Sequence, residues 1–221
     1  MFPLKDENPT RRRPFLTYGL IAANVAIFVW SIASGNFETS IDEFGMRPVE
    51  LLNGVKLYTV LTSMFLHGGF LHILFNMWYL WIFGDNVEDR MGKRWFIVFY
   101  LAAGVAGDLA HALSDPTSAV PTIGASGAIS GVLGAYVVFY PWANVYTAVV
   151  FFYFLRVVAI PALLVIGAWF ALQFLSGSIT WLSGVSTGTA YWAHIGGFIF
   201  GFVVAVLMKY RRGRDWDKLS G

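Results

Sequence analysis

The longest uncharged stretch of the chain decides the fold. Residues 157–208 read VVAIPALLVIGAWFALQFLSGSITWLSGVSTGTAYWAHIGGFIFGFVVAVLM and contain no Asp, Glu, Lys or Arg. A transmembrane helix needs about 20 mostly apolar residues, so this stretch is long enough for two spans. The polar Gly/Ser/Thr segment from Ser176 to Gly188 predicts the loop that separates them.

The composition of the whole chain agrees with a membrane protein. Of its 221 residues, 57% are hydrophobic and only 13% are charged, whereas soluble domains carry about 25% charged residues. This balance excludes a disordered chain, a coiled coil and nearly every soluble enzyme. The chain has no cysteine, which excludes disulfides, thiolate metal sites and a cysteine nucleophile. Its net charge of +2 is too small to suggest a nucleic-acid partner.

Other apolar stretches predict the remaining helices. They cover residues 14–37, 57–83, 95–113 and 116–155, with Asp108 as their one charge. The turn signal Pro141-Trp142-Ala143-Asn144 divides the last of them. We therefore expect six helices, at residues 14–34, 66–84, 94–114, 125–140, 146–175 and 191–209.

The predicted fold is an all-α, polytopic bundle of six transmembrane helices over residues 14–209, between terminal tails at residues 1–13 and 210–221. The basic run Arg11–Arg13 before the first apolar stretch also fits a cleaved signal peptide, but that stretch is longer than a signal core. A small transporter is another class of polytopic membrane protein. No internal repeat supports it, and the inner halves of the helices are too apolar for a polar pathway.

The distribution of basic residues orients the predicted bundle. Of the 15 Lys and Arg residues, all but Arg47 and Lys56 fall on one side. By the positive-inside rule, both termini lie in the cytoplasm and even-numbered helices run from the outer to the inner face. The compact six-helix form without further domains suggests a prokaryotic plasma membrane.

Four polar residues fall near the beginnings of even-numbered helices. His72 and Asn76 lie near the start of the second predicted helix, Ser126 at the start of the fourth and His194 at the start of the sixth. The orientation therefore places all four at a similar depth near the outer face. Polar groups at membrane depth usually face a bundle interior or a water-filled cavity.

Small residues recur on one face of the fourth helix and one face of the sixth. Such faces let helix backbones approach closely in a membrane. The residues concerned are Gly127, Gly131 and Gly134, and Gly197, Gly201 and Ala205. If the two faces meet, Ser126 and His194 lie at the same end of one seam. A serine needs a base within about 3 Å to become a nucleophile, and this packing provides one.

His72 and Asn76 are four residues apart, so they share one face of the second helix. Both side chains can donate hydrogen bonds, as can the free Ser126 N–H at its helix start. Such donors can stabilise the oxyanion of acyl transfer. An apolar setting also favours the neutral imidazole that His194 needs in order to accept a proton.

In this order, the motifs resemble the rhomboid family of intramembrane serine proteases. The resemblance extends over essentially the whole chain, and the motifs that carry it are Gly124-Ala125-Ser126-Gly127, His72 with Asn76, and Ala193-His194 followed by Gly197, Gly201 and Ala205. It implies a Ser126–His194 catalytic dyad and an oxyanion hole of His72, Asn76 and the Ser126 amide. It also implies a serine endopeptidase that cleaves transmembrane-helix substrates near the outer face through an acyl-enzyme. No metal or organic cofactor is implied.

Within this resemblance, Gly124, Gly127, Gly131, Gly197 and Gly201 are the expected helix-packing support of the site. The family also implies that the fifth helix and its following loop, here residues 170–191, move to admit substrate.

Two positions depart from the family pattern. Some relatives carry a tyrosine stacked on the catalytic histidine where this chain has Ser130, and a Trp-Arg pair where it has Met46-Arg47. Ser130 has no ring and cannot stack on His194.

The alternatives lack residues that they need. A zinc protease needs His-Glu-x-x-His, which is absent, and an aspartyl protease needs two aspartates within spans, where only Asp108 is found. Asp108 fits a local pair with His111, and His67 fits a structural role at the entry to the second helix. A non-proteolytic rhomboid-like protein that binds membrane helices is the second hypothesis. Such proteins usually lack the serine or the histidine, and both are present here.

The expected partners are transmembrane protein substrates and membrane lipid, with no nucleic acid; the oligomeric state is open. The tryptophans near predicted span ends fit interface anchors; they are Trp78, Trp81, Trp142, Trp181 and Trp192. The basic run from Lys209 to Lys218 fits contact with anionic lipid.

Overall fold

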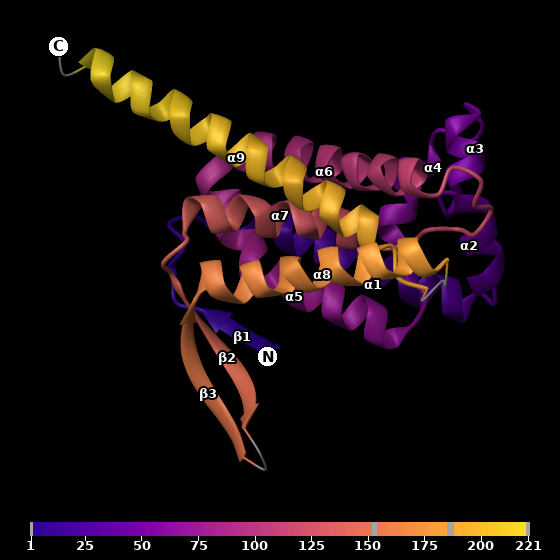
Figure 1. Cartoon of the computed structure of the whole chain (residues 1–221), viewed down its shortest axis with the longest axis horizontal. Helices are drawn as coiled ribbons and strands as arrows, with labels where there is room; N and C mark the ends of the chain where they lie inside the picture. Colours follow the sequence, from indigo (N-terminus) through magenta and orange to yellow (C-terminus); the bar gives the residue numbers. More distant parts are fainter. Residues whose placement is uncertain (1, 152–153, 185–187, 220–221) are drawn as a thin grey trace.

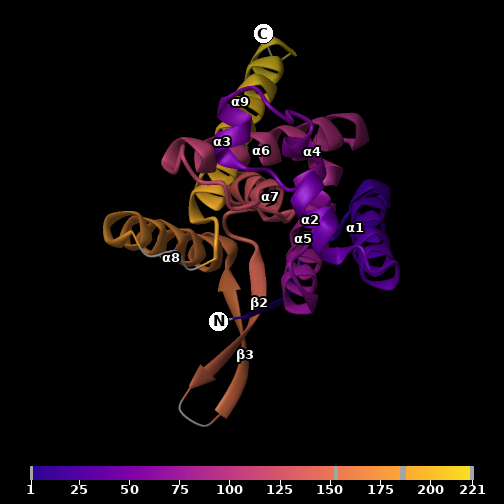
Figure 2. The same ribbon diagram turned by 90° about the vertical axis from the view of Figure 1, so that its right-hand side faces the viewer.

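The computed structural model describes residues 2–151, 154–184 and 188–219. Six long helices form a bundle (Figures 1 and 2): α1 (Phe15–Ala33), α5 (Phe70–Met91), α6 (Lys93–Ser114), α7 (Ser126–Phe139), α8 (Ala162–Ser183) and α9 (Tyr191–Leu219). Between α1 and α5 lie the short helices α2 (Phe37–Phe44), α3 (Pro48–Leu52), α4 (Thr59–Thr62) and the 3-10 turn η1 (Ser63–Phe65). These short helices gather at one end of the bundle, and the chain's C-terminus lies at the other (Figure 1).

The six long helices correspond in order to the six predicted spans, but they are not equally suited to crossing a membrane. Four are long and apolar enough, namely α1, α6, α8 and α9 to Arg211. Helix α5 qualifies together with the segment Thr59–Phe65, from which it is bent by 95°. Helix α7 has 14 residues, about 21 Å of helix at 1.5 Å per residue, against a hydrocarbon core of about 30 Å.

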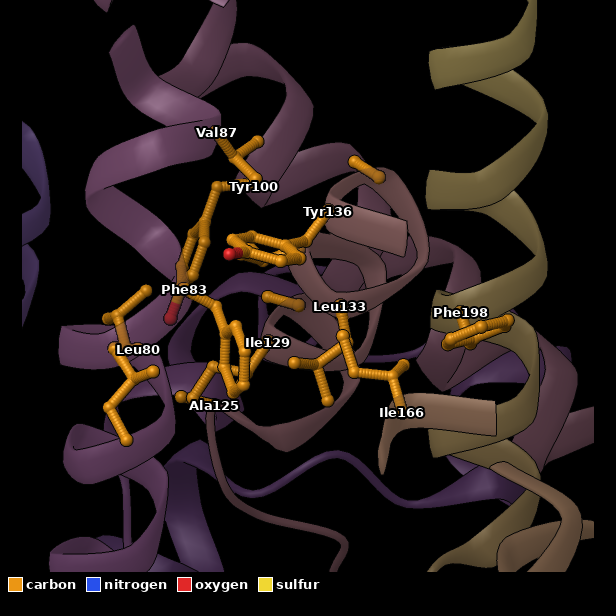
Figure 3. Packing of buried hydrophobic residues seen from close by; sticks show 14 of the residues in the cluster. Leu80, Phe83, Val87, Tyr100, Ala125, Ile129, Leu133, Tyr136, Ile166 and Phe198 are labelled. Carbon is orange, nitrogen blue, oxygen red and sulfur yellow. The ribbon is translucent and has the colours of Figure 1, made fainter. Parts of the chain in front are cut away.

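Helix α7 is the centre of the bundle. Its residues from Gly127 to Val138 are all buried. Figure 3 shows Leu133 and Tyr136 of α7 between Phe83 of α5 on one side and Ile166 of α8 on the other. Because α7 is enclosed by its neighbours, it begins inside the protein rather than at its surface, and this sets the depth of Ser126.

The predicted seam of small residues is confirmed between α7 and α9. A Cβ atom added at Gly197 would meet the backbone of Gly127, and one added at Gly201 would meet the backbone of Gly131. Gly134 lies against the backbone of Phe198 in the same way. Main chain therefore packs on main chain along this seam, which only glycine allows at such separations.

The predicted helix at residues 146–175 is wrong in its first half. Strands β2 (Asn144–Phe151) and β3 (Phe154–Pro161) form an antiparallel hairpin, and α8 begins only at Ala162. The hairpin is rich in Val, Ile, Thr and Tyr, which favour strands. Pro161 immediately before α8 fits a helix start. Because the strands are apolar except for Arg156, hydropathy does not separate them from the helix that follows.

Two other boundaries differ from the prediction. The loop expected from Ser176 is helical as far as Ser183, and residues 185–187 of that loop lie outside the described residues. The hydroxyls of Ser178 and Thr180 donate to the carbonyls of Phe174 and Ser176, so the polar side chains are satisfied within the helix. Helix α9 likewise continues beyond residue 209 to Leu219.

The predicted N-terminal tail contains a strand, β1 (Phe2–Asp6), which pairs with β2 in an antiparallel manner. The Trp78 indole N–H donates to the Pro3 carbonyl at 2.8 Å. The Tyr136 hydroxyl donates to the Asp6 carboxylate at 2.6 Å. Burial raises the pKa of Asp6 above its ordinary value. These contacts hold the start of the chain against α5 and α7.

Candidate active site

Ser126 and His194 come together at the first turns of two packed helices. Ser126 is the first residue of α7 and His194 lies in the first turn of α9. The Ser126 Oγ and the His194 Nε2 are 2.8 Å apart, a hydrogen-bond distance. Gly127 and Gly107 lie against the backbone of Ala193, so the helix starts approach closely enough for this contact. The pair has the geometry of a nucleophile and its base.

The second ring nitrogen of His194 has a partner that the sequence analysis did not find. Its Nδ1 lies 2.8 Å from the Oε1 of Gln173, and the Trp169 ring centre lies 6.0 Å from the imidazole centre at an interplanar angle of 35°. Both residues belong to α8. Ser130, which occupies the position of the stacking tyrosine in some relatives, donates its hydroxyl to the Ser126 carbonyl at 2.6 Å. Trp169 and Gln173 are thus the described neighbours that contact the imidazole from α8.

His72 presents one ring nitrogen to the space beside Ser126. Its Nδ1 accepts a hydrogen bond from the Gly68 N–H at 3.3 Å, so the neutral ring carries its proton on Nε2. A Cβ atom built on Gly124 would lie 2.7 Å from this Nε2 and 3.8 Å from the Ser126 Oγ. The absence of a side chain at Gly124 therefore leaves room between His72 and Ser126.

Gly124 was predicted among the helix-packing glycines, and this prediction is wrong. Gly124 precedes α7, and its φ of +119° is a backbone conformation that favours glycine. The residue serves the turn into α7 and the space beside His72 instead.

Asn76 lies one helical turn after His72 on α5. One hydrogen of its amide nitrogen donates to the His72 carbonyl at 2.9 Å, and its side chain lines the same cavity as His72 and Ser126. The Ser126 N–H lies at the first position of α7, where no carbonyl of the helix itself is available. The structure thus brings the four predicted polar residues to one place.

A single cavity of about 1220 Å³ joins these groups. Its lining includes polar residues beside Ser126 and His194 and apolar or aromatic ones, among them Tyr79, Leu133 and Trp169. Asp108 and His111 also line it, but the pair suggested for them is not seen among the described residues. Instead, the Asp108 carboxylate accepts from the Ser63 hydroxyl at 3.1 Å.

His67 lies in the segment that enters α5, the place for which a structural role was predicted. It is buried, and its ring centre is 5.1 Å from that of His72 in an edge-to-face arrangement. Within the described ranges, no group of three or more His, Cys, Asp or Glu residues is placed to hold a metal ion.

A bundle of apolar helices that encloses a hydrogen-bonded serine–histidine pair defines the class: an integral membrane protein with a site of serine-hydrolase geometry. The chain belongs to the rhomboid family, because the family model described as "Rhomboid domain" matches residues 55–211. This confirms the resemblance seen in the sequence.

Several curated relatives are similar to the chain. It is 37% identical over 126 residues to the rhomboid protease GluP of Bacillus subtilis, an alignment of 56% of this chain and 24% of the relative. It is 29% identical to the putative rhomboid protease YdcA of the same organism, over 57% of this chain and 62% of the relative. It is 34% identical to the human mitochondrial presenilin-associated rhomboid-like protein, over 53% and 31%. The chain spans less than two thirds of the length of these relatives.

Proposed function

We propose that the protein is an intramembrane serine endopeptidase that cleaves transmembrane-helix substrates near the outer membrane face. The observation that carries this proposal is the 2.8 Å contact between the Ser126 Oγ and the His194 Nε2 inside a cavity of the bundle. Membership of the rhomboid family, with relatives named as proteases, supports it.

The first half of the reaction acylates Ser126. The Ser126 Oγ attacks the carbonyl carbon of the scissile peptide while the His194 Nε2 takes the hydroxyl proton. The negative charge moves to the former carbonyl oxygen, where the His72 Nε2–H, the Asn76 amide and the Ser126 N–H are the candidate donors. The C–N bond then breaks, and His194 returns the proton to the leaving amine.

The second half of the reaction releases the acyl group. Water entering the cavity gives a proton to His194 and its oxygen to the acyl carbon. The ester bond to Ser126 then breaks, and its Oγ recovers the proton from His194. A substrate helix must unwind at the cleaved bond, because helical carbonyls are already hydrogen-bonded within the helix.

The proposed orientation follows from the positive-inside rule, with both termini in the cytoplasm of a prokaryotic cell. The end of the bundle that carries α2, α3 and α4 is then the outer end. The proposed partners are a transmembrane substrate and the surrounding lipid.

The proposed function is tested with the whole chain in lipid vesicles and a model protein that has one transmembrane helix. We expect cleavage of the model protein, and we expect pretreatment with a fluorophosphonate to block it. Absence of cleavage across a panel of transmembrane helices, together with absence of fluorophosphonate labelling, would contradict the proposal and favour a helix-binding role.

We expect Asn76→Ala to lower kcat by about 10²- to 10³-fold, the loss typical of one oxyanion donor, with little change in KM. Asn53→Ala is a matched control, because Asn53 also donates to the carbonyl four residues earlier but lies on the exposed α3 end, away from the cavity. Steady-state cleavage of the model protein measures both variants. Equal kcat values for the two variants would remove Asn76 from the oxyanion hole.

A further inference from the structure

We propose that Gln173 is the positioning residue of His194, a role that rests on the proposed function. Each ring nitrogen of the imidazole has one partner. The Nε2 lies 2.8 Å from the Ser126 Oγ, and the Nδ1 lies 2.8 Å from the Gln173 Oε1. A proposed serine–histidine dyad thus has a third, neutral member on another helix.

The tautomer of His194 decides whether the pair can react. The Gln173 Oε1 is an acceptor only, so the contact requires the hydrogen on Nδ1. The Nε2 is then left with a lone pair aimed at the Ser126 hydroxyl, which is the state that a general base needs. The opposite tautomer would place a hydrogen between Nε2 and the serine oxygen and prevent proton transfer.

Helix α8 holds the imidazole by two residues one turn apart. Trp169 and Gln173 share a face of α8 because they are four residues apart; Gln173 meets the ring edge and Trp169 lies beside the ring. The described side chains of α8 are buried at only a few positions: Ala162, Val165, Ile166 and Gly177. The orientation of His194 therefore depends on a helix that the rest of the bundle encloses little.

The test measures turnover and tautomer separately. We expect Gln173→Leu to lower kcat and the rate of fluorophosphonate labelling by about 10- to 100-fold, with KM nearly unchanged. Gln173→Glu keeps a hydrogen-bond acceptor beside the His194 Nδ1. We therefore expect it to retain most of the kcat and most of the labelling rate of the unaltered protein. Ser178→Ala is the matched control, because the Ser178 hydroxyl donates to the Phe174 carbonyl within α8, and this variant should behave as the unaltered protein.

Nitrogen-15 spectra of histidine-labelled protein supply the readout that needs no activity. The chain has four histidines, so His194→Ala identifies the signals of His194 by their loss. We expect a protonated Nδ1 in the unaltered protein and a mixed population in Gln173→Leu. Unchanged kcat and unchanged tautomer in Gln173→Leu would overturn the proposal. If the unaltered protein cleaves nothing, the proposed function fails while the spectra still test the Gln173–His194 contact.

A second inference concerns the β2–β3 hairpin and is independent of the reaction. We infer that this hairpin docks on the lipid surface at its end of the bundle. Figures 1 and 2 both show it extending sideways from that end, across the direction of the helices. A ribbon in this position runs along the membrane plane at the level where the apolar core meets the headgroups.

The side chains of the hairpin are suited to the boundary between the acyl chains and the headgroups. Directly paired residues share a face, so Val150 and Leu155 lie with the pair Ala148 and Val157 on one face. That face is apolar, and Val150, Leu155 and Val157 are 72%, 70% and 56% exposed. Arg156, paired with Val149, belongs to the other face, which also carries the exposed side chains of Phe154 and Val158. The first face is apolar throughout these pairs and fits acyl chains, and Arg156 on the second face supplies a positive charge for anionic headgroups.

The residues at the base of the hairpin also fit a position at the membrane interface. Trp142, in the turn before β2, is 72% exposed, and tryptophan is enriched at membrane interfaces. Strand β3 continues without a break into α8, whose first turn exposes Leu164. The apolar surface of the hairpin is thus continuous with the apolar outside of the bundle.

Because the chain has no cysteine, single-cysteine variants can test this docking. Leu155→Cys, Val157→Cys and Arg156→Cys are each labelled with an environment-sensitive fluorophore in vesicles of phosphatidylethanolamine and phosphatidylglycerol. We expect quenching by spin-labelled acyl chains at positions 155 and 157 and much weaker quenching at the matched position 156. Equal quenching at all three positions, water-like spectra throughout, or disulfide-linked dimers through position 155 would overturn the inference.

Discussion

Ser126→Ala is expected to lower the cleavage rate by on the order of 10⁴- to 10⁶-fold, the loss seen when a serine nucleophile is removed from a catalytic unit. The Ser126 hydroxyl is the described hydrogen-bond partner of the His194 Nε2, and the hydroxyl of Ser130, one turn further along α7, donates to the Ser126 carbonyl instead. Cleavage of the model transmembrane protein by equal amounts of folded protein measures the loss.

The combination with His194→Ala sharpens this expectation. When two residues act as one catalytic unit, removing either one already removes the contribution of both. The double variant Ser126→Ala/His194→Ala should therefore cleave no more slowly than either single variant. Ser31→Ala is the matched control, because Ser31 is a buried serine whose hydroxyl bonds to the Phe28 carbonyl of α1, remote from the cavity. Cleavage by Ser126→Ala at the unaltered rate, or additive losses in the double variant, would contradict the proposed dyad.

Gly201→Ala is expected to cost about 3 kcal/mol of unfolding free energy or more, at or above the upper end of overpacking effects. The added methyl group would meet main-chain atoms of Gly131, which cannot move aside as a side chain can. Helices α7 and α9 must then separate. Because Ser126 and His194 lie at one end of this seam, fluorophosphonate labelling should fall as well.

Gly19→Ala is the matched control for this stability effect. Gly19 is also a helical glycine, in α1, but nothing lies within 4 Å of a Cβ atom added there. The melting temperature in detergent should therefore be lowered in Gly201→Ala and unchanged in Gly19→Ala. Equal melting temperatures for the two variants would show that the α7–α9 seam tolerates a side chain, against the packing described here.

The sequence predicts the bundle well where long apolar runs are separated by charge. Helices α1 and α6 begin and end within about a residue of the predicted bounds, because charged or turn-forming residues flank them. The hairpin was missed, since β2, β3 and α8 lack any charge except Arg156 and hydropathy alone does not distinguish strand from helix. The enrichment of Val and Ile over residues 145–160 was the available signal.

The candidate site was predictable as far as it depends on helix starts. Ser126, His194, His72 and Asn76 converge because their helices run in the same direction and α7 and α9 pack through glycine. Gln173 belongs to no motif, and its contact depends on how α8 is rotated about its axis, which no spacing rule supplies. A lone polar residue within an apolar span was the signal that marked it for attention.

The central claim is that Ser126 is a nucleophile activated by His194, and mass spectrometry of the fluorophosphonate-treated chain tests it most directly. The Ser126 Oγ would displace fluoride from phosphorus, which leaves one phosphonyl group per chain. Peptide mapping should place that group on Ser126, and it should be absent from His194→Ala. A phosphonyl group on another serine, or equal labelling of Ser126 with and without His194, would contradict the account.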